Sequence, residues 1–219
     1  MVPHAGYVYS GPVAGSAYAL IEPWAAEIGR VVLFGPSHRV AFQGLATSTA
    51  DAWETPLGDV PLDAAGAAAL ARLPQVRPLD AAHAREHSLE VQLPFLQELL
   101  PRFELLPVVA GDAPARAVAE ALAAAWGGDD TLVLVSSDLS HYYDYETARA
   151  LDRAASDAIE ALRPDGLDEE SACGRVPVRG LLVAARERGL AARTLDLRSS
   201  GDTAGPREQV VGYGAYAFK

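Results

Sequence analysis

Short apolar runs alternate with longer stretches of helical periodicity along this chain. Three of the runs are almost continuously apolar and rich in β-branched residues, namely Arg30–Phe34, Glu104–Val109 and Thr131–Ser136. Such runs are typical of central strands that are buried on both faces of a parallel sheet. Alanine- and leucine-rich stretches with helical spacing accompany them at 13–20, 63–72, 88–100, 114–126, 145–162 and 178–188. The order is βαβ-like and predicts an α/β fold.

The C-terminal stretch and the chain length complete the expected architecture. Val210–Phe218 alternates well enough to predict a last strand that is antiparallel or at a sheet edge. The chain has 219 residues, half of them hydrophobic, which is enough to bury a full core. We therefore expect one domain that spans residues 1–219.

Charge and cysteine content narrow the classes of partner. Lys and Arg total 18 against 29 for Asp and Glu, so the net charge is -11. This charge argues against a nucleic-acid partner and against binding to an acidic membrane. No apolar run approaches the ~20 residues of a membrane span, and the single cysteine has no partner for an intrachain disulfide. We expect a soluble, cytoplasmic protein that acts on a small molecule, and we make no prediction of its oligomeric state.

Residues with metal-binding or acid/base side chains follow the predicted strands. His38 comes shortly after the first strand, Asp138 and His141 come after the third, and His4 follows what remains of a still earlier strand. In open α/β sheets the ligand crevice lies beyond the carboxyl ends of the strands. These side chains should therefore lie at the same edge of the sheet.

Cys173 lies in a different kind of segment, a turn next to Gly174 and before the helix predicted from residue 178. If this turn folds over the sheet edge, His4, His38 and Cys173 supply two imidazoles and one thiolate. Such a set leaves coordination positions open, as is typical of reactive rather than purely structural metal sites. The residues thus predict a metal site built from loop ends.

A second metal motif competes with this interpretation. His83–His87 reads H-x-x-E-H, the pattern of zinc peptidases in which two histidines hold zinc and the glutamate, here Glu86, is the general base. The context fits poorly, because Pro94 in the same helical stretch removes a backbone hydrogen bond and no third ligand follows. A zinc hydrolase built on His83, Glu86 and His87 remains an alternative.

Several motifs taken together resemble the Memo family, the Memo-like group that is related to class III extradiol ring-cleavage dioxygenases. The motifs run in the family's order along the chain: Pro3–Gly11, Gly35–His38, the segment Trp53–Gly58, Glu86–Leu96, Ser136–His141 and Cys173–Arg175. Members of the family carry a few tens of residues before the first motif, where this chain has only Met1 and Val2. We therefore expect a truncated N-terminal strand.

The resemblance implies a three-layer α/β/α fold with a mostly parallel central sheet, and it assigns places to the site residues. His4 and His38 take the places of the two histidine ligands of the related dioxygenases, and Cys173 takes that of the glutamate ligand. The expected catalytic and pocket residues are His141 as acid/base, Asp138 beside it, and Glu86 and His87 in the pocket wall.

The cysteine bears on which metal and which activity to expect. Iron(II) in the related dioxygenases is held by histidines and a carboxylate, whereas a thiolate shifts the preference toward Cu(I) and Zn(II). We expect non-haem Fe(II), with copper or zinc as alternatives. The favoured function is a metal-dependent redox protein, with dioxygenase-type oxidoreductase chemistry on a small aromatic substrate. A non-catalytic iron- or copper-binding or signalling protein is the second interpretation.

Overall fold

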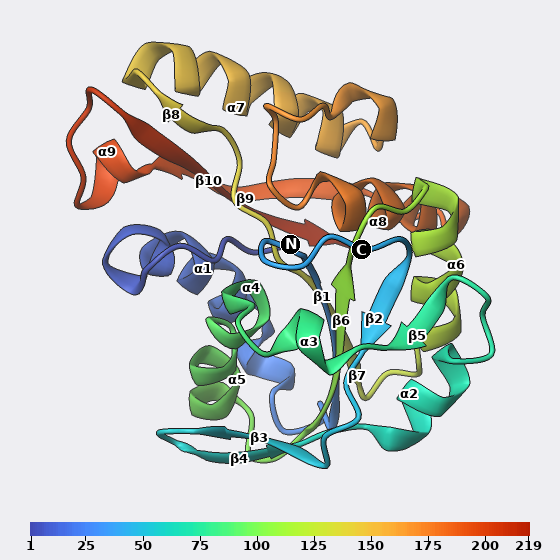
Figure 1. Cartoon of the computed structure of the whole chain (residues 1–219). Coiled ribbons are helices and arrows are strands. Elements are labelled where there is room, and N and C mark those ends of the chain that lie inside the picture. The colour runs from blue at the N-terminus through green and yellow to red at the C-terminus, as the bar shows by residue number, and fades with distance from the viewer.

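A mostly parallel five-stranded sheet forms the centre of the molecule (Figure 1). The computed structural model describes residues 1–219, and the strand order is β5-β2-β6-β1-β7. β1 pairs in parallel with β6 and β7, β2 pairs in parallel with β5, and β2 is antiparallel to β6. The strands are β1 (Arg30–Pro36), β2 (Leu45–Thr47), β5 (Val76–Pro78), β6 (Glu104–Ala110) and β7 (Thr131–Val135). The predicted α/β fold is confirmed.

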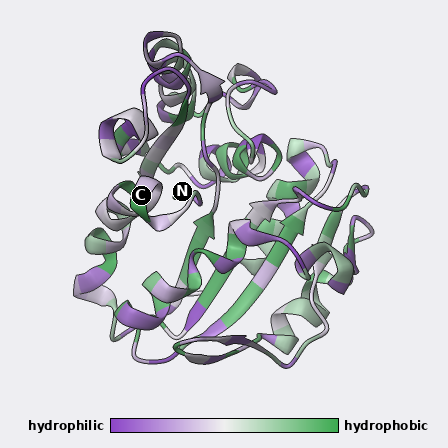
Figure 2. Cartoon of the chain, turned by 60° about the vertical axis from the view of Figure 1, so that its left-hand side comes forward, coloured by the Kyte–Doolittle hydropathy of each residue, from purple (hydrophilic) through white to green (hydrophobic).

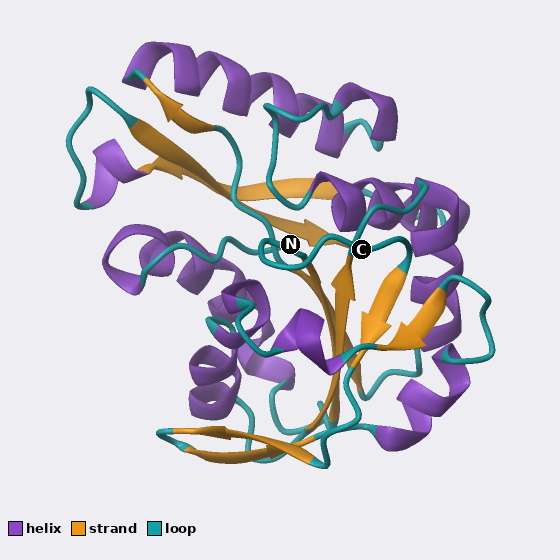
Figure 3. Cartoon of the chain, viewed as in Figure 1, coloured by secondary structure: helices purple, strands orange, loops and turns teal.

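Helices flank this sheet on both faces (Figure 3). None of them combines the length and the hydropathy that crossing a bilayer requires. The helices are α1 (Tyr7–Ile21), α2 (Ala64–Leu70), α3 (Asp80–His83), α4 (His87–Glu90), α5 (Leu93–Leu99), α6 (Ala115–Ala125), α7 (Tyr145–Glu160), α8 (Arg175–Glu187) and α9 (Ser200–Thr203), with 3-10 turns at Glu22–Trp24 and Pro164–Gly166.

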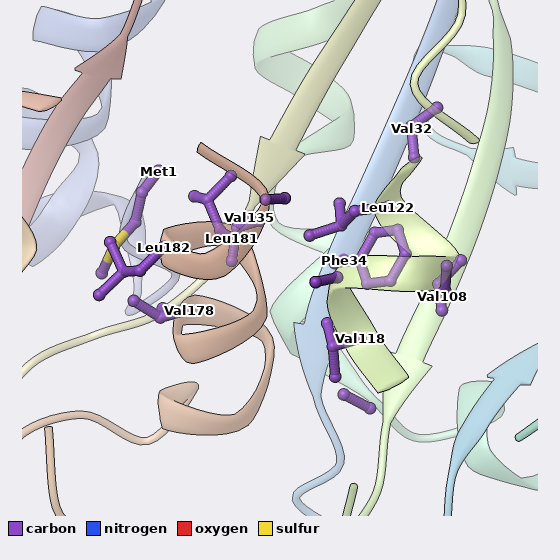
Figure 4. Close-up of a cluster of buried hydrophobic side chains, with 14 of the residues drawn as sticks. Met1, Val32, Phe34, Val108, Val118, Leu122, Val135, Val178, Leu181 and Leu182 are labelled. Atoms are coloured by element: carbon purple, nitrogen blue, oxygen red, sulfur yellow. The ribbon is translucent and has the colours of Figure 1, made fainter. Parts of the chain in front are cut away.

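Alternate residues of β1 point into two separate hydrophobic cores. Val32 and Phe34 pack with residues of α6 and α8, among them Leu122 (Figure 4). Val31 and Leu33 pack on the opposite face with residues of α1 and α5. Because both faces are covered, the strand is apolar at every position after Arg30, and Figure 2 shows the hydrophobic colour concentrated along the central strands.

A second, antiparallel sheet of order β8-β10-β9 lies beside the first. It consists of β8 (His141–Tyr143), β9 (Ala192–Ser199) and β10 (Val210–Phe218), and α7 and α1 pack against it (Figure 1). The predicted antiparallel C-terminal strand is therefore confirmed, although it belongs to this second sheet. A small hairpin of β3 (Ala52–Thr55) and β4 (Gly58–Pro61) completes the strands.

The single helix predicted over residues 88–100 was wrong. The structure divides this stretch into α4 and α5, with Val91 and Gln92 between them. Pro94 lies in the first turn of α5, where the missing backbone N–H leaves no hydrogen bond unmade. The start of this stretch matters for the site, because α4 is a short helix that begins at His87 and is capped by Glu86.

Candidate metal centre

Three imidazoles meet at the carboxyl edge of the central sheet. The ring centroids of His4 and His38 are 5.2 Å apart, those of His4 and His87 5.4 Å, and those of His38 and His87 4.9 Å. One potential ligand atom from each residue lies within 4.8 Å of the others. Two nitrogens bonded to one ion at ~2.1 Å lie at most ~4.2 Å apart, so a small contraction lets this set bind a metal.

His4 is positioned by pairing with the end of β7. Val2 forms a parallel bridge with Ser136, and this pairing carries the chain to His4 at the sheet edge. The backbone N–H of His4 then donates to Asp138 Oδ1 at 2.7 Å, and the ring Nδ1 lies 2.8 Å from Ser136 Oγ. With Nδ1 engaged, the Nε2 atom of this buried ring faces the site.

His38 is held by the buried carboxylate of Glu86. The backbone N–H of His38 donates to Oε2 at 2.6 Å, and its Nδ1 lies 2.8 Å from Oε1. Burial by itself raises the pKa of Glu86, but the hydrogen bonds from His38 and from the Ser88 backbone outweigh it and lower this pKa to about 2. Because the carboxylate is ionised and only accepts, His38 Nδ1 carries a proton, and in the neutral ring this leaves the lone pair on Nε2.

His87 follows Glu86 directly and is the first residue of α4. Its ring stacks on that of His38 with 25° between the planes, and its Nδ1 lies 3.7 Å from Glu86 Oε1. The side chain is 46% exposed, against 2% for His4, so His87 lies on the solvent side of the cluster.

Cys173 approaches the cluster from the turn before α8. Its Sγ lies 3.3 Å from His4 Nε2 and accepts the backbone N–H of Asp138 at 3.3 Å. This approach needs Gly174, because a Cβ there would lie 2.6 Å from the Cβ of Ser137. Burial, and then the nearby Asp138, raise the pKa of the thiol to about 12. The thiol is therefore protonated near neutral pH, and binding of a metal through sulfur would release this proton.

The electrostatics favour a neutral His4 ring near the ionised carboxylate of Glu86. Burial, followed by the neighbouring His38 and His87 rings, lowers the pKa of His4 well below its ordinary value. A neutral imidazole is the form that binds metals. Burial raises the pKa of Asp138 to about 6, although the His4 backbone N–H stabilises its carboxylate. The neutral His4 ring and the negative charge of Glu86 together suit a cation.

Sequence comparison identifies the group of proteins to which this arrangement belongs. The family of Memo-like proteins matches residues 1–217. The chain belongs to the Memo family. MEMO1 family proteins of Ignicoccus hospitalis and Methanopyrus kandleri are 41% and 39% identical over the whole chain, which covers 81% and 82% of their lengths. The relative from Aquifex aeolicus is 38% identical over 97% of the chain and 82% of its own length.

A solved structure supports the fold of this Memo family member. An uncharacterized protein of Escherichia coli K12 superposes with a TM-score of 0.57 at 12% identity, covering 91% of each chain. At this identity the likeness shows the shared α/β fold.

The structure brings together the residues that the sequence placed at the metal site, and it adds one. His4, His38 and Cys173 converge at the sheet edge, and their assignment as the ligands stays a prediction. His87, expected in the pocket wall, contributes a third imidazole to the cluster. Its position next to Glu86 in the family motif was the available signal, but the spacing of H-x-x-E-H paired His87 with His83 rather than with His4 and His38.

His141 and Asp138 lie at the same edge of the sheet, and the His141 ring is oriented by the backbone rather than by Asp138. Its Nδ1 lies 2.8 Å from the Leu139 carbonyl oxygen. Asp138 Oδ1 instead accepts the backbone N–H of His4. The two residues meet because each lies two positions after the bridge between Val2 and Ser136. A carbonyl only accepts, so His141 also carries a proton on Nδ1, and in the neutral ring this leaves the lone pair on Nε2.

His83 lies outside the cluster that His87 joins. Its ring packs edge-on against Trp53 at 5.6 Å between centroids. α3 ends at His83, and Glu86 has an extended backbone and caps α4 through the Ser88 N–H. The H-x-x-E-H residues therefore do not share one helix, and the face that a zinc peptidase motif needs is not formed.

Proposed function

We propose that this Memo family protein is a metal-dependent redox protein. Its ion is held by His4, His38 and Cys173, and the His87 imidazole lies beside these ligands without binding the ion. The observation that carries the proposal is the group of three imidazoles within 4.8 Å, with a thiol 3.3 Å from one of them. The donor set is suited to transition metals and unsuited to Mg²⁺ or Ca²⁺, which prefer oxygen ligands.

Non-haem iron is our first choice of metal and copper our second. Imidazoles suit both ions, and the thiolate adds preference for Cu(I) and Zn(II). A redox-active ion at this site supplies electron transfer with a small substrate. The chain's own groups bind that ion, orient its ligands and move protons.

His141 is the group we assign to proton transfer. Its Nδ1 is fixed by the Leu139 carbonyl, so Nε2 can accept a proton from a substrate. A cavity of about 700 Å³ reaches Cys173 and is also lined by Phe42 and Arg175, which gives a small molecule room beside this proposed ligand.

Electrochemistry and oxygen uptake test this function. The metal-free protein is loaded anaerobically with one equivalent of Fe(II) or Cu(I), and its voltammogram and oxygen consumption are recorded with candidate catechols. We expect a reversible wave that shifts in Cys173→Ala, because loss of the thiolate changes the charge at the metal. A loaded protein with no wave and no oxygen uptake would contradict the redox proposal.

Metal binding without turnover is the second candidate function. It is favoured by the presence of His87 as a fourth possible ligand beside His4, His38 and Cys173. If all three imidazoles and the Cys173 sulfur bind one ion, they fill a tetrahedral shell and leave no position for a substrate. X-ray absorption of the zinc-loaded protein separates the two functions. Four nitrogen and sulfur ligands without oxygen would support the holding function, and a bound water would support the reactive site.

A further inference from the structure

The buried hydroxyl of Ser136 has all its hydrogen-bonding positions in use. Ser136 Oγ donates to the Ser88 carbonyl oxygen at 2.6 Å, and it accepts from Gln92 Nε2 at 3.1 Å. A hydroxyl has one proton, and a carbonyl oxygen only accepts. The proton of Ser136 is therefore committed to Ser88, and the remaining contact, His4 Nδ1 at 2.8 Å, must donate.

The orientation of the Gln92 amide is fixed in the same way. Its Nε2 lies 2.9 Å from the carbonyl oxygen of Pro3, which needs a donor, and its Oε1 accepts the Tyr18 hydroxyl at 2.9 Å. Gln92 is fully buried, so water cannot replace these partners. A flipped amide would place its oxygen against the Pro3 carbonyl, and the second Nε2 proton is thus directed at Ser136.

We propose that Gln92 and Ser136 are positioning residues that fix the neutral His4 ring with its proton on Nδ1 and its lone pair on Nε2. In water the neutral histidine side chain prefers the opposite form, with the proton on Nε2. The hydrogen bonds of Ser136 with Gln92, Ser88 and His4, which we call the relay, reverse this preference. They direct the Nε2 lone pair toward the site, where Cys173 Sγ lies 3.3 Å away.

The consequence for metal binding rests on the proposed function. An ion that meets this ring finds the lone pair already in place, with no proton to move between nitrogens. Loss of groups that orient a ligating histidine commonly lowers metal affinity 10- to 100-fold. We expect an effect of this size when the Ser136 hydroxyl is removed.

Nitrogen-15 NMR of the metal-free protein at pH 8 tests the relay without any metal. The ring-nitrogen shifts distinguish a protonated from an unprotonated nitrogen. In the parent, His4 should show a protonated Nδ1, and in Ser136→Ala the proton should move largely to Nε2. Ser10→Ala is the matched control. Ser10 in α1 is as buried as Ser136, and its hydroxyl donates to the carbonyl of Ala5, the residue after His4, without contacting the His4 ring.

His141 serves as an internal reference for folding, because its Nδ1 proton goes to the Leu139 carbonyl, outside the relay. If Ser136→Ala does not fold, Ser136→Cys fills the site with a slightly larger side chain that is a much weaker hydrogen-bonding group, and it should give the same shift. A folded variant of either kind that keeps the parent His4 tautomer overturns the proposal.

Zinc titrations separate this inference from the proposed function. We expect Ser136→Ala to bind Zn(II) 10- to 100-fold more weakly than the parent and Ser10→Ala to bind like the parent. A tautomer change in a protein whose parent binds no metal would leave the relay standing and reject the metal function. Parent metal binding with no tautomer change in Ser136→Ala would reject the relay alone.

Discussion

His38 and Glu86 are joined by two hydrogen bonds, from the His38 backbone N–H to Oε2 at 2.6 Å and from its ring to Oε1 at 2.8 Å. The same carboxylate accepts the Ser88 N–H as the N-cap of α4. One side chain thus orients His38 and also begins the short helix whose first residue is His87. The two histidines are positioned together although 49 residues separate them in the chain.

Removing the charge of Glu86 should weaken metal binding while leaving the fold intact. Glu86→Gln keeps the size of the side chain but loses the ionised acceptor that makes His38 a better ligand. We expect Zn(II) affinity to fall 10- to 100-fold in competition titrations with a chelating dye. The control is Glu90→Gln, at an exposed position of α4. Equal affinities of the parent and Glu86→Gln would show that the carboxylate does not support the site.

His141→Ala should leave metal stoichiometry unchanged and lower any turnover. The ring is anchored on the Leu139 carbonyl and is not part of the group of three imidazoles. Loss of a general acid or base typically costs 10²- to 10⁴-fold in rate. Metal content by mass spectrometry and oxygen uptake by electrode measure the two quantities. Metal lost from this variant would place His141 among the ligands.

The buried Asp152 should make the protein less stable as pH rises. Burial raises the pKa of this carboxyl from 3.8 to about 6, against hydrogen bonds from Ser140. The folded state therefore holds the proton more tightly than the unfolded state. The stabilisation is fully present below pH 3.8 and is lost as pH rises through about 6.

The Asp152→Asn substitution isolates this contribution. Between pH 4 and pH 7.5 its free energy of unfolding in urea should rise relative to the parent, by up to ~3 kcal/mol for two pKa units. Asp157→Asn, at an exposed position of the same helix, should follow the parent at every pH. A constant difference between the parent and Asp152→Asn would reject a raised pKa at this position.

The sequence predicted the central strands well because burial on both faces leaves a strong signal. β1, β6 and β7 were found within two residues of their ends, and so the residues that follow them were placed at the correct edge. β2 and β5 were missed because each has three residues, too few for a periodic pattern. β9 was missed because half-buried polar and apolar residues alternate without strong contrast.

The site was predictable where it depends on strand ends and unpredictable where it depends on distant contacts. His38 follows from the end of β1, whereas the role of His87 requires the helix break at Glu86. That break is linked to the Glu86 contact with His38, which local spacing does not encode. The tautomer of His4 likewise depends on Gln92 and Ser136, which lie 88 and 132 residues further along the chain.

The central claim is that His4 and its neighbours form one transition-metal site, and metal stoichiometry tests it most directly. The metal-free parent, His4→Ala and His83→Ala are titrated anaerobically with Fe(II) and Zn(II) in a calorimeter. We predict one ion per chain in the parent and in His83→Ala, and at least 100-fold weaker binding in His4→Ala. The His4 imidazole is the one that contacts both other rings of the cluster and the Cys173 thiol. Undiminished binding in His4→Ala, or loss of binding in His83→Ala with His4 intact, would contradict this account.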